Sequence, residues 1–183
     1  MPTTTDPEQK TRQWLEDAVI GLNLCPFARP VYTKDQVRIA IEESAKFDDV
    51  ILRTLAEVDR LLEAAPDDIA TTLVVCPNAL ADFDEFLDAA EIVQTLLTEA
   101  GAEGVLQLAH FHPDYQFAGT EPDAPENFTN RAPYPTLHLL REAQVTEAVD
   151  SHPDPESIPQ TNIDKLEKMG REQLDEMWSK WRE

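Results

Sequence analysis

The sequence has few cysteines, few glycines and no long apolar run. Two cysteines in 183 residues are too few for a disulfide framework. Five glycines beside 14 prolines argue against flexible glycine-rich linkers. No run reaches about 18 apolar residues, the minimum for a membrane-spanning helix. Residues 1–10 are polar and lack a basic start followed by an apolar region, so we expect no secretory signal. These absences predict a cytoplasmic protein with free thiols.

Basic residues are also scarce relative to acidic ones. Lysine and arginine number 15, aspartate and glutamate number 36, and the net charge is −21. Nucleic acids and anionic membranes are bound through basic surfaces, so we expect neither as a partner. The length suits one domain spanning residues 1–183. An apolar content of 42% and a charged content of 28% are ordinary for a globular chain.

Hydrophobic patterns predict three strands separated by two helices. Residues 37–41 alternate apolar and polar side chains, residues 71–76 form a short apolar β-rich run, and residues 104–111 form a third strand. Apolar side chains recur with helical spacing over residues 47–62 and 83–97. This βαβαβ order predicts an α/β layered sandwich with at least three parallel strands, flanked by helices, with the strand at 71–76 inside the sheet.

The remaining segments complete the predicted fold. We expect the N-terminal and C-terminal helices to pack on the core of the sandwich. The segments are an N-terminal helix from Asp6 to the Cys25-Pro26 pair, a long proline- and aromatic-rich loop at 112–135, a fourth helix at 136–149, a linker at 150–160, and a final helix at 161–183 that Gly170 weakens.

Polar side chains follow each of the three predicted strands. They are Glu42–Ser44 after the first, Cys76–Asn78 after the second, and His110–Tyr115 at the end of the third. In open parallel sheets ligands bind outside the carboxyl ends of the strands. We therefore expect a ligand site at this edge, covered by the loop at 112–135.

His110 and His112 are the most specific feature of that edge. Residues two apart on a strand share a face, so both imidazoles could reach one metal ion, with Cys76 completing the site. A carboxylate of Asp114 or Glu42 is an alternative ligand. Without a metal, the same side chains could act as catalytic acids and bases. The alternative to both is a structural role, in which a histidine bonds the backbone.

A basic cluster in an acidic protein suggests an acidic ligand. Arg131 lies upstream of the predicted helix at 136–149, in which His138 and Arg141 are three residues apart and share a face. This cluster could bind a substrate carboxylate or phosphate. An internal ion pair, for example with Glu142, is the alternative. Further side chains expected to bind substrate are Tyr115, Asn130 and Asn78.

Both cysteines precede a proline. Cys25 and Cys76 could act as a nucleophile or as a ligand for zinc, iron or haem iron. They could equally be small buried apolar side chains. The sequence has no glycine-rich phosphate loop, no G-x-S-x-G turn and no C-x-x-C motif.

Three segments together resemble a bacterial family catalogued as domain of unknown function 1415. The segments read Gly-Leu-Asn-Leu-Cys-Pro-Phe-Ala at 21–28, His-Pro-Asp-Tyr-Gln-Phe at 112–117, and Asn-Arg-Ala-Pro-Tyr-Pro-Thr-Leu-His-Leu-Leu-Arg-Glu at 130–142. The resemblance implies a bacterial cytoplasmic protein. It brings no activity, so the expected function depends on the residues alone.

The sequence favours a small-molecule enzyme acting on a small acidic substrate at the carboxyl edge, with or without a bound metal. In this hypothesis His110, His112, Cys76 and Asp114 carry the chemistry. One alternative is a non-catalytic binder of a transition metal or haem that uses the same cysteines and histidines. A second is an acidic adaptor that docks a protein partner through the C-terminal helix.

Overall fold

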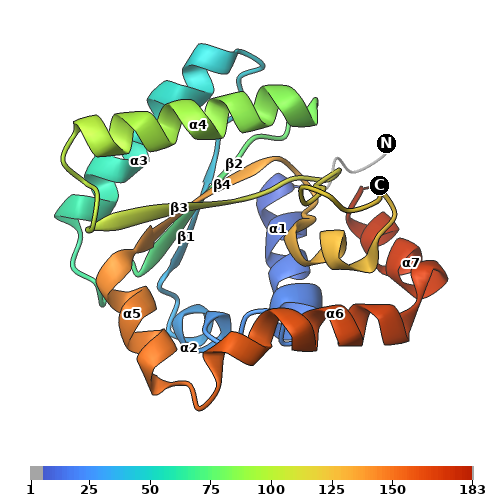
Figure 1. Ribbon diagram of the computed structural model, residues 1–183. Helices are drawn as coiled ribbons and strands as arrows, with labels where there is room; N and C mark the ends of the chain where they lie inside the picture. Colours follow the sequence, from blue (N-terminus) through green and yellow to red (C-terminus); the bar gives the residue numbers. More distant parts are fainter. Residues whose placement is uncertain (1–5, 183) are drawn as a thin grey trace.

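The computed structural model describes residues 6–182 and contains one mixed four-stranded sheet (Figure 1). Its strands are β1 (Val37–Ile41), β2 (Thr71–Val75), β3 (Leu106–Phe111) and β4 (Thr136–Arg141), in the order β1-β2-β4-β3. The α/β class expected from the sequence is confirmed. Residues 1–5, part of the stretch predicted to carry no secretory signal, and residue 183, the end of the predicted final helix, lie outside the described residues.

The prediction of at least three parallel strands is confirmed only for one pair. β1 and β2 form a parallel pair, but β4 lies between β2 and β3 and runs antiparallel to both. β3 therefore never pairs with β2. The βαβαβ pattern could not show that β4 lies between β2 and β3, because the residues of β4 have the composition and spacing typical of a helix.

The segment predicted as a helix at 136–149 instead forms β4 followed by α5 (Glu142–Ser151). Leu137 and Leu139 are fully buried on one face of the sheet, whereas His138 points to the other. As a central strand, β4 buries alternate leucines in a core, and its backbone hydrogen-bonds to strands on both sides. The free energy gained from this burial and pairing outweighs the helical preference of leucine.

α3 (Phe47–Glu63) and α4 (Phe83–Glu99) cover one face of the sheet (Figure 1). Their apolar sides pack on alternate strand residues to form the first core. The fully buried members include Val50, Leu61, Phe86 and Val93 from the helices and Val74, Leu137 and Leu139 from the strands.

A buried ion cluster also ties β1 to α3. The Glu57 carboxylate accepts two hydrogen bonds from Arg38, at 2.6 and 3.0 Å, and lies near Arg53 and Arg60. Burial alone would raise the pKa of Glu57, but the hydrogen bonds and charges of Arg38 and the other two arginines outweigh it and lower the pKa. Glu57 therefore stays ionised and links the helix to the edge strand.

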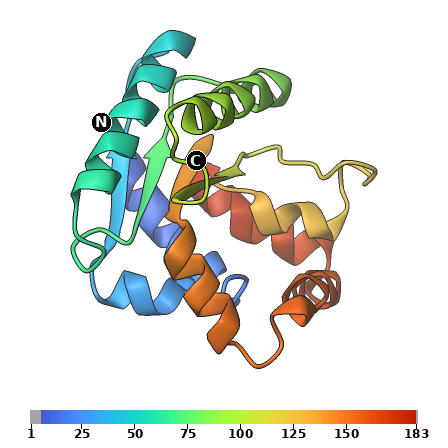
Figure 2. The ribbon, with the colours of Figure 1, turned by 60° about the vertical axis from the view of Figure 1, so that its left-hand side comes forward.

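Helices from both ends of the chain lie on the other side of the sheet (Figures 1 and 2). They are α1 (Pro7–Trp14), the π-helix η1 (Leu15–Ile20), α2 (Ala28–Thr33), α5, α6 (Ile158–Met169) and α7 (Arg171–Arg182). A second core joins α1 and η1 to α6 and α7. Its buried members include Trp14, Ala18, Phe128, Leu166, Leu174, Trp178 and Trp181.

The terminal helices differ in detail from the prediction. The first helix changes to π geometry at Leu15 instead of continuing as one α-helix. The final helix starts at Ile158, inside the segment expected as a linker, and breaks at Gly170, whose φ is 78°. The loop at 112–135 contains a short 3-10 helix, η2 (Pro125–Asn130), and another, η3 (Pro155–Ser157), precedes α6. Within residues 6–182, no helix combines the length and apolar character needed to cross a membrane.

Candidate functional site

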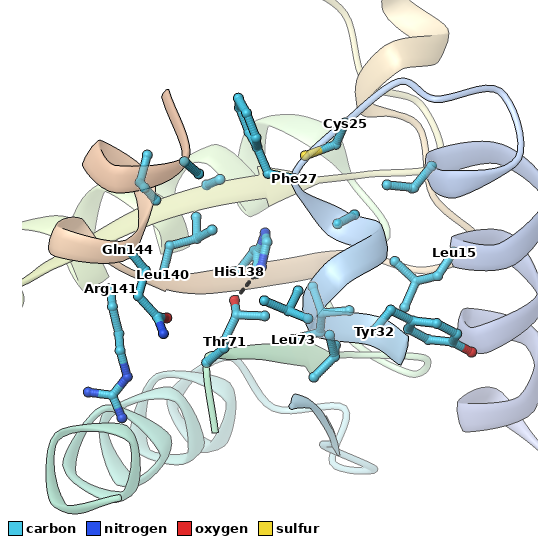
Figure 3. Close-up of a pocket in the computed structure, with 18 of the residues that line it drawn as sticks. Leu15, Cys25, Phe27, Tyr32, Thr71, Leu73, His138, Leu140, Arg141 and Gln144 are labelled. Carbon is cyan, nitrogen blue, oxygen red and sulfur yellow. Dashed lines mark hydrogen bonds between the residues drawn. The ribbon is translucent and has the colours of Figure 1, made fainter. Parts of the chain in front are cut away.

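A cavity of about 350 Å³ lies on the sheet face opposite α3 and α4 (Figure 3). The strands form its floor, and η1, α2 and α5 form its walls. Most lining side chains are apolar. They include Leu15, Val19, Ile20, Phe27, Val31, Val37, Leu73, Ala109, Phe111, Leu140, Val145 and Ala148. This cavity is on the face of the sheet, not at the carboxyl edge where the sequence predicted a site.

His138 is a polar side chain in the floor of this cavity. It projects from β4, in register with Leu73 of β2 and Ala109 of β3. Its Nε2 lies 2.6 Å from the Thr71 hydroxyl, which also donates to the Leu139 carbonyl at 2.7 Å. Burial lowers the pKa of His138 to about 4. The imidazole is therefore neutral at physiological pH.

Cys25 and Phe27 line the cavity from the turn that precedes α2, on the side of His138 away from Thr71 in Figure 3. Burial raises the pKa of the Cys25 thiol, so this group is neutral as well. A nucleophilic cysteine needs a depressed pKa. Cys25 therefore provides a neutral, polarisable sulfur at the cavity wall and not a reactive thiolate.

The π-helix η1 and Gly21 set the path of this turn. A Cβ atom on Gly21 would lie 2.2 Å from the Asp17 carbonyl oxygen and 2.8 Å from that of Glu16. Only glycine fits there without moving backbone. Asn23 then takes a positive φ of 52°, which reverses the chain and brings Cys25 to the cavity wall. π-Turns of this kind recur beside functional sites.

At the carboxyl edge, His110 lies in β3 and His112 directly follows the end of this strand; both imidazoles lie beside the Phe86 ring, on one side of the sheet, as their spacing indicates. His112 is fully buried, and both ring nitrogens are occupied. Nε2 donates to the Leu80 carbonyl and Nδ1 accepts from the Asp114 backbone, both at 3.0 Å. Burial lowers its pKa. This is the structural alternative that the sequence left open, in which a histidine ties loop backbone together.

His110 lies among the rings of Phe86 and Tyr115, with centroid distances of 5.8 and 5.6 Å. Burial lowers its pKa, and its Nδ1 is buried without a hydrogen-bond partner in the described part of the chain. The predicted thiol ligand, Cys76, is fully buried in the first core, and burial with the charge of Glu42 raises its pKa to about 12.

Nothing in the structure brings these groups into a metal-binding geometry. Across residues 6–182, no set of three or more His, Cys, Asp or Glu side chains is placed to hold a metal ion. Asp114, expected at the same site, is largely exposed, and one of its oxygens lies 3.5 Å from Arg182. His110, His112, Cys76 and Asp114 therefore share an edge of the sheet without sharing a ligand position.

The predicted basic cluster does not form. Because β4 is a strand, His138 and Arg141, three residues apart, point to opposite faces. The Arg141 guanidinium extends toward α3, away from the cavity (Figure 3), and donates to the carbonyls of Leu61, Ala64 and Ile69. Arg131 donates to the carbonyls of Tyr115 and Pro122 in the long loop. Both arginines thus hold backbone in place.

Two of the other expected substrate ligands bond backbone carbonyls, and the third is buried among aromatic rings. Asn78 donates to the Glu43 carbonyl at 2.8 Å, and Asn130 donates to the His110 carbonyl at 3.3 Å. Tyr115 is buried within the aromatic group on β3 and α4. These bonds hold the loops at the carboxyl edge together.

The family described as "Protein of unknown function (DUF1415)" matches residues 6–176. The chain belongs to this family. The three segments that suggested the relationship all lie within the matched residues. No curated protein and no solved structure matches the chain.

In this DUF1415 chain, sequence reasoning missed Thr71 as a site residue and placed His138 in the wrong element. A usable signal was present for one of them. His138 is a polar residue among leucines, a pattern that marks a strand position facing something other than a core, whereas Thr71 is followed by a second threonine and carries no such signal. Their proximity depends on the pairing of β2 with β4, which the sequence does not display.

Proposed function

We propose that this protein binds a small, uncharged and largely apolar molecule in the cavity between the sheet and η1, α2 and α5. The observation that carries the proposal is the cavity itself. Its volume of about 350 Å³ falls in the usual range for small-molecule sites, which is roughly 300–1,000 Å³. Its wall is mainly apolar, with His138 as a polar point in the floor, the common composition of such sites.

The proposal favours a neutral ligand over the acidic substrate expected from the sequence. Arg141 borders the cavity, but its guanidinium is turned toward α3 and bonded to backbone carbonyls there, and Arg131 is held in the long loop, so neither directs its charge into the cavity. His138 is neutral as well. An anion placed here would lose its water without gaining a cationic partner, which is strongly unfavourable.

The protonation states support binding over nucleophilic catalysis. Cysteine–histidine catalysis uses a thiolate beside an imidazolium. Here burial raises the pKa of Cys25 and lowers that of His138, so both groups are uncharged. A neutral thiol and a neutral imidazole can contact a ligand and hydrogen-bond it without reacting with it.

A second candidate is the binding of haem, and the presence of Cys25 and His138 in one apolar cavity favours it. Cysteine thiolate sulfur and neutral imidazole nitrogen are both axial ligands of haem iron, so Cys25 would lose its proton if it bound the iron. Titration with haemin would test it. A Soret band that disappears in His138→Gln supports haem binding, and an unchanged spectrum in that variant contradicts it.

The main proposal is tested by NMR with methyl-labelled protein and indole or indene as the probe. We expect shifts at Val37, Leu73 and Val145, which line the cavity, and none at Val58 or Leu97 in the other core. Benzoate, a charged probe of similar size, should leave all five unchanged.

Two variants locate the site. Ala109→Leu fills the floor of the cavity and should abolish binding of indole and indene. His110→Gln changes the opposite face of the sheet and should leave both affinities unchanged. If binding survives Ala109→Leu but is lost in His110→Gln, the ligand binds at the carboxyl edge of the sheet, and the proposal is wrong. Absence of binding by both probes would overturn it as well.

A further inference from the structure

We propose that the ligand carries a hydrogen-bond donor, which His138 accepts at Nδ1, and that Thr71 is the residue that sets this specificity. The inference rests on the proposed function, because it assumes a neutral molecule in the cavity. It goes further by naming the chemical group that the site selects. The argument follows from the position of one hydrogen atom.

The Thr71 hydroxyl has one hydrogen and two close neighbours. Its Oγ1 lies 2.7 Å from the Leu139 carbonyl oxygen and 2.6 Å from Nε2 of His138. A backbone carbonyl can only accept, so the hydroxyl hydrogen goes to Leu139. If it went to His138 instead, two oxygen lone pairs would face each other at 2.7 Å. Nε2 of His138 must therefore carry a hydrogen and donate it to Thr71.

This fixes the state of the other ring nitrogen. A neutral imidazole carries one hydrogen, so with Nε2 protonated, Nδ1 is a bare acceptor. Nδ1 makes no hydrogen bond to any group within residues 6–182, and it is not among the buried atoms that lack a partner. Figure 3 shows this nitrogen on the side of the ring away from Thr71, toward the cavity-lining side chains of Cys25 and Phe27.

Thr71 has little freedom to adopt another arrangement. It is 7% exposed and occupies the first position of β2, between β1 and β4. Rotating the hydroxyl away would leave the Leu139 carbonyl and Nε2 without this partner in a buried region, which is unfavourable. The orientation of His138 is therefore held before any ligand arrives.

A fixed acceptor in an apolar cavity discriminates between ligands that differ in one atom. Ligands with a free N–H or O–H, such as indoles, phenols and alcohols, gain a hydrogen bond to Nδ1. Ligands whose only polar atom is an acceptor, such as ethers and furans, place a lone pair against another lone pair. The expected preference is about tenfold, from the typical energy of one neutral hydrogen bond.

Three bicyclic probes of nearly equal shape isolate this effect. Indole has an N–H donor, benzofuran has an oxygen acceptor in the same ring position, and indene has neither. Calorimetry on the full chain should give the order indole, then indene, then benzofuran, with indole about tenfold tighter than benzofuran. Equal affinity for indole and benzofuran would overturn the inference.

Thr71 is a positioning residue, so its test needs a readout that packing alone does not change. Nitrogen-15 NMR of labelled histidine reports which ring nitrogen of His138 carries the hydrogen. We expect Nε2 in the wild type and in Thr71→Ser, which keeps the hydroxyl. In Thr71→Val, which keeps the shape but not the hydroxyl, Nε2 loses the acceptor that holds its hydrogen, so we expect both tautomers to be populated and the preference for indole over benzofuran to be lost. A wild-type spectrum with Nδ1 protonated contradicts the inference.

The outcomes separate the two proposals. If none of the three probes binds, the proposed function fails and with it this inference. If all three bind in the cavity but do so equally, and Thr71→Val binds them as the wild type does, the cavity is a binding site without the specificity assigned to His138. Thr71→Ser is the control. If it keeps the tautomer and the ligand preference of the wild type, the loss of the hydroxyl, and not a change in folding, accounts for the Thr71→Val result.

Discussion

At the residue scale, His138 makes the stability of the fold depend on pH. Its pKa is about 4 in the folded chain, and that of an unfolded histidine is about 6.5. Between these values the unfolded chain binds a proton that the folded chain does not. The free energy of unfolding therefore falls as pH falls through this interval, by about 3 kcal/mol for His138.

Urea unfolding of the wild type and of His138→Gln at pH 7 and pH 4 measures this contribution. We expect the loss of stability on acidification to be smaller in His138→Gln. Burial also lowers the pKa of His110 and His112, but both remain in the variant, so the difference between the two proteins isolates His138. Equal losses in the two proteins would show that His138 is already charged, or free to charge, in the folded chain.

At the element scale, the turn from η1 to α2 depends on Gly21. In Gly21→Ala the new methyl group would meet backbone oxygens at 2.2 and 2.8 Å, which a side-chain rotation cannot relieve. We expect a loss of about 1–3 kcal/mol in the free energy of unfolding. We also expect weaker binding of indole, because the turn that carries Cys25 and Phe27 must shift.

Gly119→Ala is the matched control for this prediction. Unlike Gly21, whose φ is −63°, Gly119 has a positive φ of 82°, but an added Cβ would meet nothing within 4 Å, and the residue lies in the loop at 112–135, away from the cavity. Its substitution should lower stability by about 1 kcal/mol through backbone strain and leave indole affinity unchanged. If Gly21→Ala binds indole as the wild type does, the turn does not shape the site.

The helices and strands also show which parts of the fold could be predicted from the sequence. Local patterns placed β1, β2, β3, α3 and α4, because each has the periodicity of its own element. They failed for β4, whose strand conformation comes from pairing with β2 and β3. That failure moved the candidate site. With β4 taken as a helix, His138 and Arg141 seemed to share a face, and the association of His138 with Thr71 was invisible.

The polar residues at the carboxyl edge show a related limit. Sequence reasoning placed His110, His112 and Asn78 near one another because strand ends gather at one edge. It could not tell whether their polar atoms were free. His112 and Asn78 are committed to the carbonyls of Leu80 and Glu43. The availability of a side chain depends on loop backbone that has no periodic pattern.

At the scale of the whole molecule, the chain closes on itself through α7. Leu174 and Trp181 are fully buried, and Trp178 donates from its ring nitrogen to the Arg131 carbonyl. They pack in the core that contains Trp14, so the two ends of the described chain share one core. This core lies beside η1, which forms a wall of the cavity. The last helix therefore supports the candidate site without lining its cavity.

Truncation after Gly170 tests this arrangement and bears on the adaptor hypothesis. Removing α7 would expose the apolar surface of α1 and α6, and we expect the truncated chain to lose cooperative thermal unfolding. Trp181→Ala should lower the free energy of unfolding by about 3–5 kcal/mol, and Trp181→Phe by less, because the ring still fills most of the space. Lys180→Ala, an exposed change on the same helix, should have almost no effect. If the truncated chain unfolds cooperatively at the wild-type temperature, α7 is peripheral to the fold, and it is then free to dock a partner as the adaptor hypothesis requires.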